Sequence, residues 1–155
     1  MYSKQEASIL TQQFWTSFGQ YLAPVRSADG EKINWINYKT SQKYVHFNMM
    51  ADTKSAKIAI TLSHKEPLFQ KVYFDKLLLF KSRLLEFTSE DWEWRLHTTD
   101  QYGRIISEIA ITLQPVNVLN KLDWPAIISL LKPRIIALDE FWCAYKYAFY
   151  DPPLK

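Results

Sequence analysis

The stretch AKIAITLSH (residues 56–64) decides the fold class, because its pattern is that of a half-buried strand. Ile58, Ile60 and Leu62 alternate with smaller or polar residues. Successive side chains of a strand point to opposite faces of a sheet, so one face of this strand is expected to meet the core. Pro67 follows soon after the strand and suits the first turn of a helix.

Two further strands are expected before this one. KINWINY (residues 32–38) and KYVHFNM (residues 43–49) precede it, and the connectors between the three runs are short and polar. Short polar connectors favour hairpins. The three runs therefore predict an antiparallel meander.

One helix is expected before this meander in the sequence, and another after it. Apolar residues recur near helical spacing over residues 4–22, after a cap at Ser3 or a neighbour, and the segment ends before Pro24. They recur again over residues 68–87 behind Pro67. The second segment predicts one long helix packed on the sheet.

The next segment predicts a second hairpin. Trp92, Trp94 and Leu96 alternate with charged residues and a histidine. A turn at residues 100–103 then leads into an apolar alternation over residues 105–113. Two antiparallel strands joined by this turn are expected.

A third helix is expected after Asp123, and Pro133 should kink it or split it in two. Its end, EFWCAYKYAFY (residues 140–150), carries aromatic residues on more than one face. Such a helix either meets another subunit or domain, or is buried on two sides within the monomer. Self-association or a protein partner through this helix is therefore one expectation.

The element order is α, three strands, α, two strands, α. It predicts a single α+β domain over residues 1–155, with a mainly antiparallel five-stranded sheet packed by three helices. A chain of 155 residues with 48% hydrophobic residues is long and apolar enough for one such core.

Composition excludes several functional classes. No apolar run approaches the roughly 20 residues of a membrane span, and the first residues lack a signal-peptide pattern, so a cytoplasmic protein is expected. Cys143 is the only cysteine, which excludes internal disulfides and multi-cysteine zinc sites. The net charge of +3 permits contact with DNA, but no basic stripe supports it.

The order α, three strands, α, strand is also that of a known nuclease core. That core carries one acidic residue and then, on its third strand, an acidic residue two positions before a lysine. Its chemistry uses carboxylates to hold Mg²⁺ and a lysine to assist the attacking water. Ser63, which cannot replace a carboxylate, stands two positions before Lys65. Asp52 and Lys54 give the only acid-x-lysine match, in a segment with the composition of a turn.

Two site hypotheses remain at the ends of the third strand. If that strand began earlier, Asp52 and Lys54 could line a catalytic site with Glu66 or Asp29. At its other end, His64, Lys65 and Glu66 form a polar cluster before a helix, where a histidine could carry protons. We expect a structural role for this cluster instead, with His64 hydrogen-bonded beside the helix start.

No metal site is expected, because His46 and His97 lie on different strands without metal-ligand spacing. Aromatic residues suggest a binding surface. Trp35 and Trp94, flanked by Arg95, could form a platform on which bases stack. The main expectation is that these tryptophans pack beneath a helix.

Several blocks also carry a family resemblance: FWTSF, INWINYKT, LSHK, WEWRLHTTD and DWPAIISLLKPRIIALDEFW. Together they resemble the bacterial family catalogued as domain of unknown function 4268, over nearly the whole chain. The resemblance implies a stand-alone cytoplasmic protein or a domain appended to nuclease-like segments. It brings no catalytic residues with it.

The sequence favours a non-enzymatic binding or interaction module without cofactors. The alternative is a divergent or inactive metal-dependent nuclease, or a DNA-associated domain, and only this alternative would require Mg²⁺.

Overall fold

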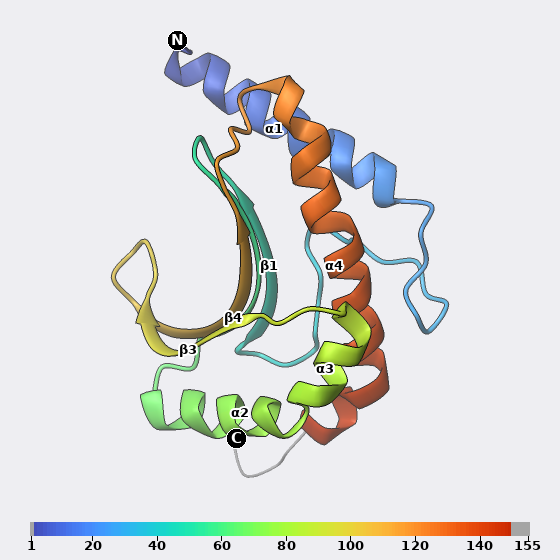
Figure 1. Cartoon of the computed structure of the whole chain (residues 1–155), viewed down its shortest axis with the longest axis vertical. Helices are drawn as coiled ribbons and strands as arrows, with labels where there is room; N and C mark the ends of the chain where they lie inside the picture. Colours follow the sequence, from blue (N-terminus) through green and yellow to red (C-terminus); the bar gives the residue numbers. More distant parts are fainter. Residues whose placement is uncertain (1, 150–155) are drawn as a thin grey trace.

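The computed structural model describes residues 2–149, which form one antiparallel sheet and four α-helices (Figure 1). The strands, in the sheet order β1-β2-β4-β3, are β1 (Val45–Ala51), β2 (Ala56–Leu62), β4 (Ile105–Leu113) and β3 (Glu93–Thr99). The α-helices are α1 (Lys4–Leu22), α2 (Pro67–Leu79), α3 (Lys81–Thr88) and α4 (Trp124–Tyr145). Short 3₁₀ turns, η1 (Lys121–Asp123) and η2 (Lys146–Phe149), flank α4.

The expected strand over residues 56–64 is present as β2, at the centre of the sheet. Its core face carries Ile58 and Ile60, which lie beside Ile111 and Ile109 of β4 and are fully or almost fully buried. The sheet is strongly curved, and α4 runs along its convex side (Figure 1). One face of the sheet thus belongs to the core, as the alternation predicts.

Helix α1 begins and ends close to the predicted bounds. Ser3 caps it in a reciprocal capping box, in which the Ser3 hydroxyl accepts from the Glu6 backbone N–H and the Glu6 carboxylate accepts from Ser3 N–H. Phe14 and Phe18 on its inner face are fully buried. The apolar stripe of the sequence is therefore the face that meets the core.

The expected strand over residues 32–38 is not formed, so the sheet of the described residues has four strands and not five. Asn34 starts a turn, because its side-chain oxygen accepts hydrogen bonds from the backbone N–H groups of Ile36 and Asn37. Trp35 is buried, and its indole donates to the carbonyl of Val25 at 2.8 Å. Side-chain bonds replace the strand ladder here, and the α-βββ-α-β order of the nuclease core is lost with this strand.

A buried carboxylate on α4 holds this loop in place. Asp139 accepts hydrogen bonds from the Ser27 hydroxyl (2.7 Å), the Ala28 backbone N–H (2.7 Å) and the Tyr38 hydroxyl (2.6 Å). Burial and the contact with Asp139 raise the pKa of the Tyr38 phenol well above its usual range, so Tyr38 stays a donor. One side chain thereby ties both ends of the loop to the longest helix.

The predicted central helix is two helices, because the chain changes direction at Phe80, whose φ of −102° and ψ of 10° are not helical. The Phe80 ring packs against Tyr145 and Phe149 at centroid distances of 5.1 and 5.6 Å. A single straight helix would not bring this ring to the end of α4. The break between α2 and α3 at Phe80 therefore coincides with the packing of the Phe80 ring against the end of α4.

Pro133 does not split the last helix, since α4 continues from Trp124 to Tyr145. A proline removes the hydrogen bond to the carbonyl four residues earlier, which here belongs to Ser129. The Arg134 guanidinium lies near that carbonyl at 3.5 Å and donates to the carbonyl of Leu130 at 2.9 Å. These donors compensate part of the loss.

The aromatic end of the chain packs largely within the monomer. Phe141, Trp142 and Phe149 are buried in the core, whereas Tyr147 is exposed. Tyr150 lies outside the described residues. None of the helices within residues 2–149 is long and apolar enough to span a membrane.

Replacing Asp139 by alanine is expected to lower the free energy of unfolding by about 3 kcal/mol, because three buried or half-buried donors lose their acceptor. Urea unfolding followed by circular dichroism measures the change. Glu140→Ala is the matched control: Glu140 is exposed on the same helix, and its loss should change the free energy by less than about 0.5 kcal/mol. Equal effects of the two substitutions would contradict the role given to Asp139.

Candidate functional site

The concave side of the sheet forms a hollow with a volume of about 780 Å³. It lies on the side of the sheet away from α4, and none of the helices within residues 2–149 lies over it (Figure 1). His46 and Asn48 of β1, Lys57 and Thr61 of β2, and Glu108 of β4 are among its lining residues. The β3–β4 hairpin projects beside the same hollow. We call this hollow the sheet groove.

The floor of the sheet groove is almost inaccessible to solvent, although no helix or strand within residues 2–149 covers it. Glu108 is only 3% exposed, and Thr61 and the neighbouring Ala59 and Ala110 are buried as well. Curvature of the sheet and the long side chains around these residues explain this burial. A ligand in the groove would therefore meet a carboxylate at the bottom of a cleft, shielded from bulk water.

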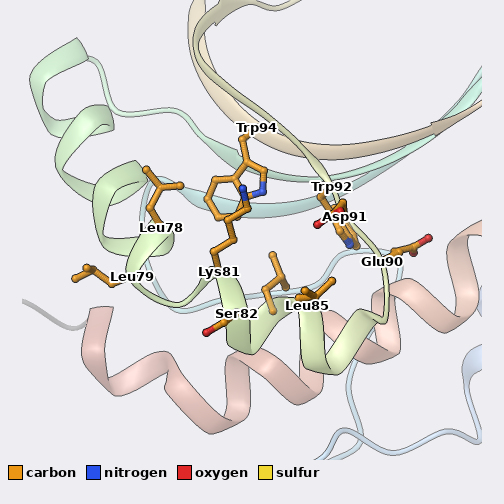
Figure 2. Close-up of a pocket in the computed structure, with 10 residues that line it drawn as sticks. Leu78, Leu79, Lys81, Ser82, Leu85, Glu90, Asp91, Trp92 and Trp94 are labelled. Carbon is orange, nitrogen blue, oxygen red and sulfur yellow. The ribbon is translucent and has the colours of Figure 1, made fainter.

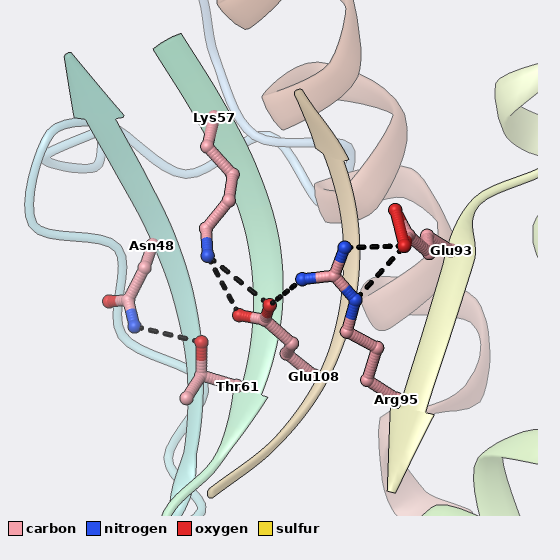
Figure 3. A network of polar contacts seen from close by, with 6 residues as sticks. All are labelled: Asn48, Lys57, Thr61, Glu93, Arg95 and Glu108. Atoms are coloured by element: carbon pink, nitrogen blue, oxygen red, sulfur yellow. Dashed lines mark hydrogen bonds and ion pairs between the residues drawn. The ribbon is translucent and has the colours of Figure 1, made fainter. Parts of the chain in front are cut away.

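Two cations share the Glu108 carboxylate across three strands (Figure 3). The Lys57 ammonium donates to both carboxylate oxygens, at 3.2 and 2.9 Å. The Arg95 guanidinium contacts one of these oxygens at 3.4 Å and also binds Glu93, its neighbour on β3. Antiparallel register brings these residues together, because Glu108 lies opposite both Thr61 and Arg95.

Neutral polar pairs extend this network across the groove. The Asn48 amide donates to the Thr61 hydroxyl at 3.0 Å, and the His46 ring nitrogen Nε2 lies 2.9 Å from the Ser63 hydroxyl. Partial burial lowers the pKa of His46 below its ordinary value, so the ring is neutral at pH 7. The groove thus offers neutral hydrogen-bonding groups along β1 and β2, and charged groups on β2, β3 and β4.

The lining has more positive than negative side chains. Its cations are Lys57, Lys65, Arg95 and Arg104, and its carboxylates are Asp100 and Glu108, with Glu93 bound to Arg95 beside them. Tyr44 and Tyr102 lie among the lining residues, and Arg104 lies over the Tyr102 ring at 5.1 Å. The surplus of cations favours an anionic partner over a cationic one.

The polar cluster expected at the end of β2 is divided between two faces. His64 is buried and stacks on Tyr73 at 4.6 Å and near Tyr44 at 5.0 Å, while Lys65 lines the sheet groove. Glu66 precedes α2 without a side-chain capping bond. The three residues do not converge on one site.

The environment of His64 differs from the expected hydrogen-bonded one. Its Nδ1 atom is buried and has no hydrogen-bond partner among residues 2–149. Burial, with a smaller contribution from the nearby His46, lowers the pKa of His64 to about 4. The ring therefore acts as a neutral aromatic side chain in the core.

Gln70 was not singled out from the sequence, yet it anchors α2 to the sheet. Its amide donates to the carbonyls of His64 (2.7 Å) and Ile105 (2.8 Å), and its oxygen accepts from the Ser107 hydroxyl at 2.9 Å. A glutamine on the same helical face as buried Tyr73 and Phe74 is the sequence signal for such a role. Glu108 gave a similar signal, as the one acid within the apolar run of β4.

The candidate nuclease residues lie apart. Asp52 sits in the turn between β1 and β2, where its carboxylate accepts from the backbone N–H groups of Lys54 and Ser55 at 2.8 Å each. These bonds lower the pKa of Asp52. Glu66 follows the other end of β2, about 20 Å away at roughly 3.3 Å per residue of strand.

Asp29 lies in a third place, beside the Lys146 ammonium at 3.8 Å near the end of α4. Searched over the described part of the chain, the histidine, cysteine, aspartate and glutamate side chains form no group of three or more that could hold a metal ion. The carboxylates of the nuclease hypothesis therefore share no site.

The expected aromatic platform is also divided. Trp35 is buried beneath the loop that precedes β1, and Trp94 packs edge-to-face on Phe74 of α2 at 5.6 Å. Arg95 points to the opposite face of β3, into the sheet groove. Of the three predicted binding residues, only Arg95 lines this groove.

Comparison with known proteins places the chain in a family. A family model described as a domain of unknown function (DUF4268) matches residues 10–146, and the chain belongs to this family. No curated protein and no solved structure matches the chain.

The buried histidine predicts a specific pH dependence of stability. An unfolded chain protonates His64 near its ordinary pKa of 6.5, whereas the folded protein does so only near pH 4. The free energy of unfolding should therefore fall as the pH drops from 6.5 to about 4, by at most about 1.4 kcal/mol per pH unit from this group. In His64→Phe, which keeps the stacking on Tyr73, this contribution should vanish.

Urea unfolding of both proteins at several pH values isolates the contribution of His64 as the difference between the two curves. Parallel curves between pH 6.5 and 4 would contradict the assignment.

Proposed function

We propose that this member of the DUF4268 family is a non-enzymatic binding module, and that its sheet groove receives an acidic protein segment. One observation carries the proposal: a concave, uncovered sheet face with a buried carboxylate already neutralised by Lys57 and Arg95. Antiparallel sheets commonly pack one face on the core and leave the other facing solvent, where it is open to a partner.

The charge of the groove supports an acidic partner. Lys57 and Arg95 are engaged by Glu108, and Arg104 is engaged by Asp100 at 3.0 Å. Lys65 adds positive charge beside the end of β2. Carboxylates of a partner would extend these networks, and the groups of Asn48, Thr61 and Ser63 offer hydrogen bonds to its backbone.

The arrangement of aromatic residues favours protein over nucleic acid. Base stacking needs exposed aromatic faces along the binding surface. Trp35 and Trp94 lie on the helix side of the sheet. Of the two tyrosines that line the groove, Tyr44 and Tyr102, the Tyr102 ring already has Arg104 over it at 5.1 Å. DNA is the second candidate, supported by the same surplus of cations. The separation of Asp52 and Glu66 gives no support to a Mg²⁺-dependent nuclease.

A labelled poly-glutamate peptide tests the proposal by fluorescence anisotropy. Binding should weaken with rising salt, and Lys65→Glu or Arg104→Glu should each raise the dissociation constant about tenfold because a favourable charge contact becomes repulsive. Lys4→Glu, the same charge change on exposed α1, should leave the constant within about twofold.

The same titration with a single-stranded oligonucleotide separates the two candidates. Binding of the oligonucleotide without binding of the peptide would replace the acidic protein segment by nucleic acid. Binding that is insensitive to both groove substitutions would remove the sheet groove as the site.

A further inference from the structure

Strand β3 is an edge of the sheet, and its free side is exposed. It pairs with β4 alone among the described strands. Most of its residues are exposed on either face, from Glu93 to Thr99. An edge strand leaves every second backbone N–H and C=O group without a ladder partner, so it can accept a strand from another chain. The pairing with β4 is irregular between Arg95 and Thr98, so the regular part of this edge is residues 93–95.

A hollow of about 420 Å³ adjoins the same edge on the helix side (Figure 2). Its apolar lining consists of Trp94 of β3, Trp92 just before β3, and leucines of α2 and α3. Lys81, Ser82, Glu90 and Asp91 complete the lining. Leu79 is 81% exposed, and Leu78 and Leu85 are exposed as well. Lys81 lies over the Trp94 ring at 5.5 Å. Apolar side chains gathered beside an open strand edge are typical of an interface.

The sequence of β3 indicates what occupies this edge. Glu93 and Arg95 flank Trp94, and both point toward the sheet groove, where they bind each other. When a second copy of β3 is placed antiparallel with Trp94 on the two-fold axis, residue 93 of each copy lies opposite residue 95 of the other. Each Glu93 then faces an Arg95 across the interface, so the strand is complementary to itself.

We propose that two copies of this chain associate through their β3 edges, antiparallel and centred on Trp94. The two sheets become one continuous sheet, and the Trp94 side chains of both copies meet on the helix side, next to the exposed leucines. The two sheet grooves then join across the axis into a longer concave surface. This interface is distinct from the C-terminal helix, whose Phe141 and Trp142 are buried within the chain.

Charge reversal tests this pairing with two variants of the full chain. Glu93→Arg places two arginines opposite each other at each cross-strand contact, and Arg95→Glu places two glutamates there. Each variant alone should raise the dimer dissociation constant at least about tenfold, because both cross-strand contacts become repulsive. An equal mixture of the two variants should form a dimer again, since the arginines of one variant then face the glutamates of the other.

Sedimentation velocity measures these constants, with circular dichroism to check folding. Glu140→Arg, which reverses the charge of an exposed acid on α4, is the matched control and should dimerise like the unchanged protein. Because Arg95 also binds Glu108, Arg95→Glu could fail to fold. In that case a second series tests the pairing: the dissociation constant of the dimer should rise from the unchanged protein to Glu93→Gln and again to Glu93→Arg. A monomer at 100 µM, or variants that dimerise as tightly as the unchanged protein, would overturn the proposal.

Discussion

Packing of the helices on one side of a strongly curved antiparallel sheet is the constraint on which the rest of the structure depends. Ile58 and Ile60 of β2, which packs against α4, form the centre of the core together with Ile109 of β4. The same curvature turns the other side into a cleft, whose floor is buried although none of the described helices and strands covers it. The core and the candidate site are thus two sides of the same strands.

The ion network on the concave side is difficult to explain by stability alone. Removing a carboxylate from water is costly, and replacing a buried ion pair by apolar side chains is often neutral or stabilising. Glu108 nevertheless lies at the bottom of the groove, with Lys57 and Arg95 on two neighbouring strands. Buried charges that cost free energy on folding tend to occur at functional sites, which is why we place the site here.

The sequence predicted correctly those helices and strands whose formation depends on residues close to one another in the chain. The alternation around Ile58 and Ile60 and the capped stripe of α1 are examples, and both are confirmed. The prediction of a strand over residues 32–38 was wrong, because the alternation of Ile33 and Trp35 with polar residues resembles that of a strand. The conformation of this segment depends on Asp139, which is about a hundred positions away and whose partners cannot be recognised from the sequence.

The candidate site was less predictable for the same reason. Arg95 was singled out for its place beside a tryptophan, yet its partner Glu108 is reached only through the pairing of β3 with β4. Strand order and register create the groove, and neither follows from one sequence.

Amide chemical shifts test the central claim most directly, because they locate a bound ligand residue by residue. Titration of ¹⁵N-labelled protein with the poly-glutamate peptide should shift amides along the groove, at His46, Asn48, Lys57, Arg95 and Glu108. Amides of α1 and α4 should stay in place. Shifts confined to the helices, with the groove unchanged, would contradict the account.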